Sequence, residues 1–348
     1  MSVASTLTPP PDVATARRPT ASRLAWFVVA LVVAALIALA SIAFGARLVG
    51  WHDIVTAFTG EETGIAQAAV QKRVPRTLLA LLIGAALGLS GAVMQGVTRN
   101  PLADPGILGV TTGAALAVVI GIAFFSMTTP TTYVFVAIGG AAVAAVFVYT
   151  VGSLGRGGAT PLKLALAGAA TAAALSSLVS AILLPRIDVM NEFRFWQIGG
   201  VGGGTYASIS LVLPFLVIGA VICFVSARGL NSLALGEDVA AGLGERVVTT
   251  RLVAAAGAVL LCGAATAVAG PIAFVGLVVP HVCRLLVGID HRWLLPFSML
   301  VGAILLTGAD VIGRVVARPA EVDVGIITAL VGAPFFIYIV RRQKVRSL

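Results

Sequence analysis

The chain has 348 residues, of which 59% are hydrophobic and only 11% are charged, and its formal net charge is +9. Because about a quarter of the residues of a soluble domain are charged, this composition excludes a pair of soluble domains and predicts a membrane protein. A strongly basic soluble protein would suggest a nucleic-acid partner, but here the basic residues stand at the ends of apolar stretches, as membrane topology requires. The lipid bilayer is therefore expected as a partner, and nucleic acid is not.

Ten apolar spans are expected between residues 24 and 340, each close to the length of about 20 residues that a helix needs to cross the hydrocarbon core. They predict an all-α membrane protein with ten transmembrane helices in one domain. Residues 1–23, rich in Pro, Ser, Thr and Ala, are expected to form a disordered tail, and residues 341–348 a short basic tail. The spans are 24–46, 77–98, two in 106–155 divided at 126–132, 164–185, 206–227, two in 252–283 divided at Gly270-Pro271, 293–313 and 324–340.

Both termini are expected on the same side of the membrane, because the number of spans is even. Most of the 23 lysine and arginine residues fall on the side of the termini, and the positive-inside tendency makes that side the cytoplasm. A cleavable signal peptide is the alternative for the first span, since Ala38-Leu39-Ala40 is similar to a cleavage site. The uncharged run over residues 24–46 is long for the apolar part of a signal peptide, so a retained first helix is favoured.

Two short segments suggest an internal repeat. GAALGLSG (84–91) and GAATAVAG (263–270) share the leading Gly-Ala-Ala and the final Gly, and they end the second and the seventh span. An offset of five spans reverses the orientation, so spans 2–5 and 7–10 are expected to form an inverted repeat, as in many transporters. The other explanation is that small residues let helices pack closely, and both explanations can hold.

Charged residues at the outer ends of two spans are candidate site residues. The segment QKRVPR (71–76) places Arg73 and Arg76 at the start of the second span, with Pro75 expected in its first turn. Docking of an acidic partner and snorkelling to lipid headgroups are both open for these cations. Asp310 and Arg314 stand four residues apart on one face of the ninth span, which predicts an ion pair. This pair is either functional, as charges at membrane depth usually are, or interfacial.

The loop between the second and third spans is rich in turn signals. RNPLADPGILG (99–109) contains Asn-Pro and Asp-Pro-Gly, which favour tight turns. A bland tight loop is the simplest interpretation. A contact surface on the cytoplasmic side is the alternative, and it would involve Arg99, Asn100, Pro101 and Asp104.

The segment LALGEDVAAGLGER (233–246), between the sixth and seventh spans, is short and acidic in an otherwise apolar chain. Its apolar positions recur four residues apart, and acidic residues in the first turn suit the helix dipole. One or two short amphipathic helices in the cytoplasm are therefore expected. A helix lying on the membrane usually has a basic face, so an acidic start favours a protein partner instead. The candidate contact residues are Leu235, Gly236, Glu237, Asp238, Val239, Leu243 and Gly244.

The sequence predicts neither a catalytic site nor a metal site. Its three cysteines and three histidines are scattered without ligand spacing. No lysine follows a glycine, so there is no Walker A motif. No cofactor is therefore expected in this chain, and if ATP drives the protein, another chain must bind it.

Four long segments, in order, resemble the FecCD-type permeases, the membrane subunits of ABC importers for iron-siderophores, haem and vitamin B12. The resemblance extends from about residue 73 to residue 340, nearly the whole expected membrane core. The segments are RVPRTLLALLIGAALGLSGAVMQGVTRNPLADPGILGV (73–110), LGEDVAAGLG (235–244), GPIAFVGLVVPHVCR (270–284) and ARPAEVDVGIITALVGAPFFIYIV (317–340).

This resemblance implies a ten-span permease domain over residues 24–340 that pairs with a second permease in the bacterial cytoplasmic (inner) membrane. It implies two ATPase subunits, which would bind ATP and Mg, and an external substrate-binding protein. Segment 233–246 would be the coupling segment that docks into the ATPase, and Arg73, Arg76 and Arg314 would meet acidic residues of the binding protein. The chain would then be a transport subunit and not an enzyme.

A ferric siderophore is the first expectation for the substrate, and haem and cobalamin remain open. An ion-coupled secondary transporter is the alternative of a different class, since inverted repeats also suit it. It would need buried acidic residues for coupling, and Asp310 is the one that lies within an expected span. Whether the partner permease is identical or a paralogue is left open.

Overall fold

The computed structural model describes residues 19–59, 64–154 and 160–342, and all regular structure in these ranges is helical. The expected tails at 1–18 and 343–348 lie outside the described residues. The helices are α1 Thr20–Ala43, α2 Trp51–Thr59, α3 Ile65–Thr98, the 3-10 helix η1 Pro105–Leu108, α4 Val110–Phe125, α5 Pro130–Ser153, α6 Pro161–Leu183, α7 Ile187–Gln197, α8 Tyr206–Val225, α9 Ala227–Ala234, α10 Glu237–Gly242, α11 Val247–Ala269, α12 Val275–Val287, α13 His291–Val316 and α14 Val324–Arg342.

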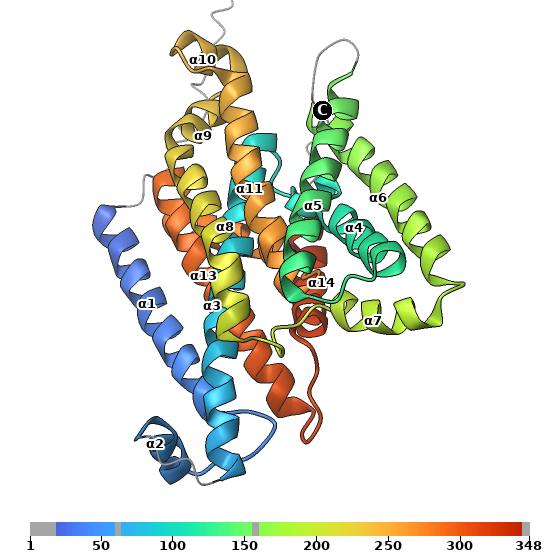
Figure 1. Cartoon of the computed structure of the whole chain (residues 1–348). Helices are drawn as coiled ribbons and strands as arrows, with labels where there is room; N and C mark the ends of the chain where they lie inside the picture. The colour runs from blue at the N-terminus through green and yellow to red at the C-terminus, as the bar shows by residue number, and fades with distance from the viewer. Residues whose placement is uncertain (1–18, 60–63, 155–159, 343–348) are drawn as a thin grey trace, which may run out of the picture.

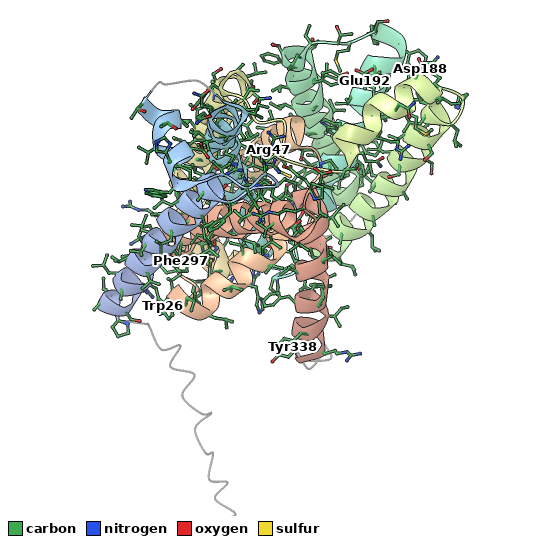
Figure 2. All side chains as sticks on the ribbon, turned by 90° about the horizontal axis from the view of Figure 1, so that it is seen from below. Trp26, Arg47, Asp188, Glu192, Phe297 and Tyr338 are labelled. Carbon is green, nitrogen blue, oxygen red and sulfur yellow. The ribbon has the colours of Figure 1, made fainter. Side chains whose placement is uncertain are left out.

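Seven described helices are long and apolar enough to cross a membrane: α1, α3, α5, α6, α8, α11 and α13. Three shorter apolar helices, α4, α12 and α14, fall on the remaining expected spans. An all-helical membrane fold is therefore confirmed, while the count of ten crossings and the inverted repeat stay predictions. Aromatic side chains such as Trp26 on α1 and Tyr338 on α14 are exposed at the periphery of the bundle, as a lipid-facing surface requires (Figure 2).

The long helices run roughly side by side, with α2 at one end of the bundle and α10 at the other (Figure 1). These are called the α2 end and the α10 end below. The short helices α2 and α7 were not predicted, because neither is apolar over the length of a span. The helix α3 begins at Ile65 and not at Thr77, so Pro75 lies inside the helix and the expectation that it starts the helix is wrong.

The chain breaks between α11 and α12 as expected at Gly270-Pro271. Gly270 has a φ of +68°, and residues 271–274 are non-helical before α12 begins at Val275. A loop around Gly199 covers this break: the Gly200 amide donates to the Ala269 carbonyl (2.8 Å), and the Gly325 amide donates to the Gly199 carbonyl (3.1 Å). Irregular backbone inside a membrane protein is tolerated where such contacts satisfy its polar groups.

The most buried span is α3, which packs against α13, α12, α11 and α1. Glycines allow this: a Cβ added to Gly84 would lie 2.4 Å from the Gly302 carbonyl oxygen, and one added to Gly91 would lie 2.0 Å from that of Gly276. Close helix packing therefore explains the GAALGLSG segment directly. The long α3 also has the reach to place polar residues at both ends of the bundle.

Candidate functional site

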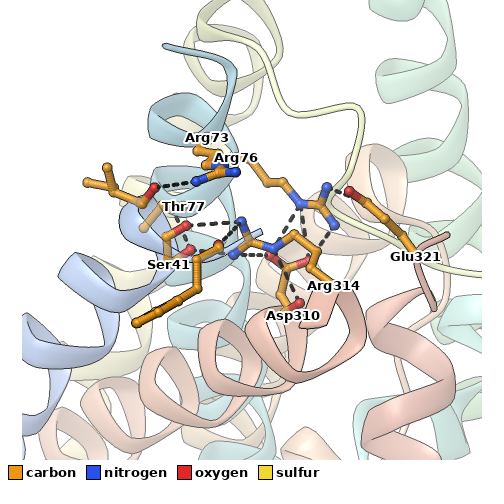
Figure 3. Close-up of polar contacts among 9 residues, drawn as sticks. Ser41, Arg73, Arg76, Thr77, Asp310, Arg314 and Glu321 are labelled. Atoms are coloured by element: carbon orange, nitrogen blue, oxygen red, sulfur yellow. Dashed lines mark hydrogen bonds and ion pairs between the residues drawn. The ribbon is translucent and has the colours of Figure 1, made fainter. Parts of the chain in front are cut away.

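Four charged residues and one acidic loop residue meet at the α2 end (Figure 3). The helix α3 supplies Arg73 and Arg76, α13 supplies Asp310 and Arg314, and the loop between α13 and α14 supplies Glu321. We call this group the arginine cluster. The structure thus brings together all three arginines that the sequence analysis selected.

The carboxylate of Asp310 lies at the centre of the cluster. It accepts hydrogen bonds from Nε (3.2 Å) and Nη2 (2.8 Å) of Arg76, and the Arg314 Nη2 lies 2.9 Å from its other oxygen. Asp310 and Arg314 are each only 1% exposed. Burying a charge costs several kcal/mol unless the charge is paired and hydrogen-bonded, so these contacts are required for the fold. The predicted pair of Asp310 and Arg314 is confirmed, and Arg76 is an additional partner.

The arginines also hold the end of α1. Arg314 Nη1 donates to the carbonyl of Ser41 (3.0 Å), and Arg73 Nη1 donates to those of Ile42 (3.1 Å) and Ala43 (2.8 Å). These are carbonyls of the last turn of α1, which have no partner within the helix. Cationic side chains commonly satisfy such groups. Two neighbouring helices therefore cap α1.

Arg76 has a second acidic partner at the surface. Its Nη1 lies 2.6 Å from the Glu321 carboxylate, whose side chain is 41% exposed. Glu321 is thus the solvent-facing member of the cluster, whereas the guanidinium groups of Arg73, Arg76 and Arg314 are engaged by oxygens of this chain. Their contact with an external partner remains a prediction.

The expected coupling segment lies at the α10 end, on the short helices α9 and α10 (Figure 1). Leu235, Val239 and Leu243 are between 51% and 66% exposed. A row of exposed apolar side chains outside the membrane-spanning part is typical of a protein contact surface. Gly236 and Gly244, with φ of +116° and +83°, form the turns before and after α10.

The acidic start of α10 is confirmed, since Glu237 and Asp238 lie in its first turn. Glu237 also pairs with Arg251 of α11 at 2.7 Å. This contact ties α10 to a long helix and leaves the apolar row free. Asp238 is exposed beside it.

The 99–109 loop is a tight turn stabilised by its own side chains. Asn100 Oδ1 accepts from the Leu102 amide (2.9 Å), and Asp104 Oδ1 accepts from the Gly106 amide (2.8 Å) as the N-cap of η1. Burial raises the pKa of the Asp104 carboxyl, and the hydrogen bond from Gly106 partly offsets that rise. Arg99 and Pro101 are exposed, so these two residues of the loop are available for a contact.

One polar junction was missed by the sequence analysis. The Asn231 Oδ1 of α9 accepts a hydrogen bond from the His291 backbone amide (2.9 Å) and also lies 2.8 Å from His291 Nδ1. The Asn231 Nδ2 donates to the Asp290 carboxylate (2.7 Å). Burial favours a raised pKa for Asp290, but hydrogen bonds from Asn231 and the Arg292 amide lower it below its ordinary value. Asp290 caps α13, and a capping residue before an apolar span was the signal that could have revealed this junction.

No group of three or more His, Cys, Asp or Glu side chains in the described ranges is placed to hold a metal ion. The cysteines Cys223, Cys262 and Cys283 are buried and unpaired. They therefore pack as small core residues.

The fold is similar to a solved structure of a metal-chelate type ABC transporter in an inward-facing conformation, with a TM-score of 0.77 and 28% identity over 92% of this chain and 99% of that one. This similarity defines the chain as the permease subunit of an ABC importer, a transport protein and not an enzyme. The sequence profile of the FecCD transport family matches residues 31–342. The chain belongs to this family.

Several curated relatives are similar over most of their length. The ferric enterobactin transport system permease protein FepD of Escherichia coli is 45% identical over 87% of this chain and 91% of its own. The iron(3+)-hydroxamate import system permease protein FhuB of Bacillus subtilis is 45% identical over 78% of this chain and 71% of its own. The hemin transport system permease protein HmuU of Yersinia pestis is 39% identical over 78% of this chain and 82% of its own.

We predict that Asp310→Asn strongly destabilises the permease. The change leaves Arg76 and Arg314 without the carboxylate between them, and removing one member of a buried ion pair costs about 3–5 kcal/mol. Thermal unfolding of the purified protein in detergent measures the effect. The matched control is Glu321→Gln, which removes an exposed partner of the same Arg76 and should cost at most about 1 kcal/mol. Equal effects of the two changes would contradict a structural role for Asp310.

Proposed function

We propose that this permease moves a ferric-siderophore complex from a substrate-binding protein across the bacterial cytoplasmic membrane, driven by ATP hydrolysis in a separate ATPase subunit. The observation that carries the proposal is the 45% identity to permeases named for ferric enterobactin and iron(3+)-hydroxamate. Haem or cobalamin is the second candidate, because relatives named for hemin and cobalamin transport are 39% and 41% identical.

Coupling to an ion gradient is less well supported. A secondary transporter needs an acidic group inside the bundle that can bind and release its ion. Asp310 is the buried acid of the long spans, and two guanidinium groups occupy it at 2.8 and 2.9 Å. It is therefore a structural anion and a poor ion carrier.

The substrate path is proposed at the interface with a second permease, identical or paralogous. A shallow apolar hollow runs along α14, lined by Ile198, Gly325, Ile326, Ala329, Leu330, Ala333 and Pro334. Ile326 and Leu330 are exposed there although the helix is apolar. A partner helix seated on this face would complete the packing of α14, and small residues would allow its close approach.

The substrate is tested by uptake into proteoliposomes that contain the permease, its ATPase and its binding protein. We expect ATP-dependent accumulation of a ferric siderophore and no competition by haem or cobalamin. Preferential uptake of haem or cobalamin would select the second candidate. Uptake that ignores ATP but stops with a proton uncoupler would reject an ATP-driven importer.

The ATPase is proposed to dock on the apolar row of Leu235, Val239 and Leu243. We predict that Leu243→Asp abolishes copurification of the ATPase and ATP-driven uptake, because it places a charge in an apolar contact. Leu243 is exposed, so the permease itself should fold normally. The control is Leu48→Asp, which makes the same change at an exposed leucine of the α2 end. Normal coupled uptake by the Leu243 variant would place the docking surface elsewhere.

The binding protein is proposed to dock at the α2 end, with its acidic residues near Arg73, Arg76 and Arg314. Glu321 already occupies the outward-facing side of Arg76, so an incoming carboxylate must replace it. Electrostatic complementarity of this kind steers and orients a partner. Lys72, exposed beside the cluster, adds to the positive charge.

We predict that Glu321→Gln increases the affinity for the binding protein two- to fivefold, since an exposed ion pair is worth up to about 1 kcal/mol. Titration of the binding protein onto the permease in nanodiscs measures this. Asp188→Asn is the control, because it removes an exposed carboxylate of α7, seen from the same end in Figure 2. If both variants gain the same affinity for the binding protein, the effect comes only from the change in net charge. If neither variant gains affinity, docking at Arg76 is contradicted.

A further inference from the structure

A hollow of about 490 Å³ opens at the α10 end, where α8 passes into α9 beside the first turn of α13. The three helices are in contact there. The hollow is lined by Phe224, Val225, Ala227, Arg228, His291 and Arg292. It is remote from both the arginine cluster and the apolar face of α14.

The hollow is basic and its cations are available. Arg228 and Arg292 are exposed, and no carboxylate in the described part of the chain lies within 4.0 Å of either guanidinium group. The nearby Asp290 is committed to other groups, since it accepts from Asn231 (2.7 Å) and from the Arg292 backbone amide (3.0 Å). Two guanidinium groups therefore line one hollow, and in the described ranges neither has an ion-pair partner within 4.0 Å, although the Asp290 carboxylate is near enough to Arg292 for this cation to help lower the pKa of Asp290.

The other wall of the hollow is apolar and continues into a lipid-facing surface. Phe224 and Val225 are exposed at the end of α8. Val221 and Val217, one and two turns further along this candidate span, are exposed as well. Because α8 is a candidate span that ends at Val225, a bilayer around it would place these cations at the boundary between the hydrocarbon core and the headgroups, with an apolar path leading away from them.

The floor of the hollow is the junction between α9 and α13. His291 is buried there and is held to Asn231 of α9 by two contacts of 2.8 and 2.9 Å. Arg228 belongs to α9 and Arg292 to α13. An anion bound by both arginines would therefore bridge the helix that leads into the coupling segment and the helix that carries Asp310.

We propose that this hollow binds an anionic phospholipid, with Arg228 and Arg292 holding its phosphate and Phe224 and Val225 contacting the start of an acyl chain. Charge-assisted hydrogen bonds from arginine to phosphate are strong, and basic pockets between membrane helices suit anionic headgroups. The bound lipid stabilises the α9 and α13 junction behind the coupling segment. The site lies in the cytoplasmic leaflet if the α10 end is cytoplasmic, as the proposed function requires.

The test is native mass spectrometry of the purified permease titrated with phosphatidylglycerol and with phosphatidylcholine. Wild type is expected to bind phosphatidylglycerol more tightly. The double change Arg228→Gln with Arg292→Gln should weaken phosphatidylglycerol binding on the order of tenfold and leave phosphatidylcholine binding unchanged. The matched control, Arg47→Gln with Arg194→Gln, removes two exposed arginines from the rest of the surface.

Three outcomes would overturn the proposal. The first is an equal loss of phosphatidylglycerol binding in the double variant and in its control. The second is a thermal stabilisation of wild type by inorganic phosphate that equals the stabilisation by phosphatidylglycerol. The third is unchanged lipid binding by the double variant together with loss of ATPase copurification. The last outcome would assign the two arginines to the ATPase interface. Because lipid binding is measured on the permease alone, its result is independent of the substrate and of the ATPase.

Discussion

The close contact between α3 and α13 is the constraint on which the rest of the structure depends. In the hydrocarbon core of a membrane, the hydrophobic effect does not drive apolar helices together, so packing and polar contacts must hold them together. A Cβ added to Gly84 or to Gly88 would lie 2.4 or 2.3 Å from a carbonyl oxygen of α13, so only glycine fits at either position. The two backbones therefore interlock over several turns, and the helices that cover them are positioned by this pair.

Polar contacts at both ends of this pair attach the peripheral helix α1. At the α2 end, Arg73 and Arg314 donate to its last carbonyls. At the α10 end, the Arg23 guanidinium lies 4.0 Å from Asp290 and 6.0 Å from the centre of the Trp293 ring. Between these ends most of α1 faces outward. The attachment of α1 thus combines packing along α13 with contacts from a few cations at its two ends.

The sequence predicted those features that depend on local spacing. The apolar spans follow from the thickness of the bilayer, the pair of Asp310 and Arg314 follows from a separation of four residues, and the exposed row of α10 follows from helical periodicity. The break at Gly270-Pro271 follows from the chemistry of proline. Each of these can be deduced from a window of a few turns.

The features that the sequence did not predict join residues that are far apart. Arg76 meets Asp310 across 234 positions, and His291 meets Asn231 across 60. The arginines selected as docking residues also have partners within the chain, which the sequence did not predict, because spacing shows that cations cluster but not which oxygens they reach. The helices α2 and α7 were missed since they lie outside the apolar spans, where hydropathy carries no signal.

The interlocked pair of α3 and α13 also limits how the protein can move. Asn231 and His291 join α9 to the start of α13, and Asp310 and Arg76 join the far end of α13 to α3. A displacement of α9 therefore acts on a unit that reaches both ends of the bundle, because the glycine contacts leave α3 no freedom to slide along α13. In the proposed arrangement, access to the substrate path changes where packing is open, and the uncovered face of α14 is such a place. With the proposed second permease seated on α14, alternating access is thus expected to move α14 and that permease relative to a rigid α3 and α13 unit.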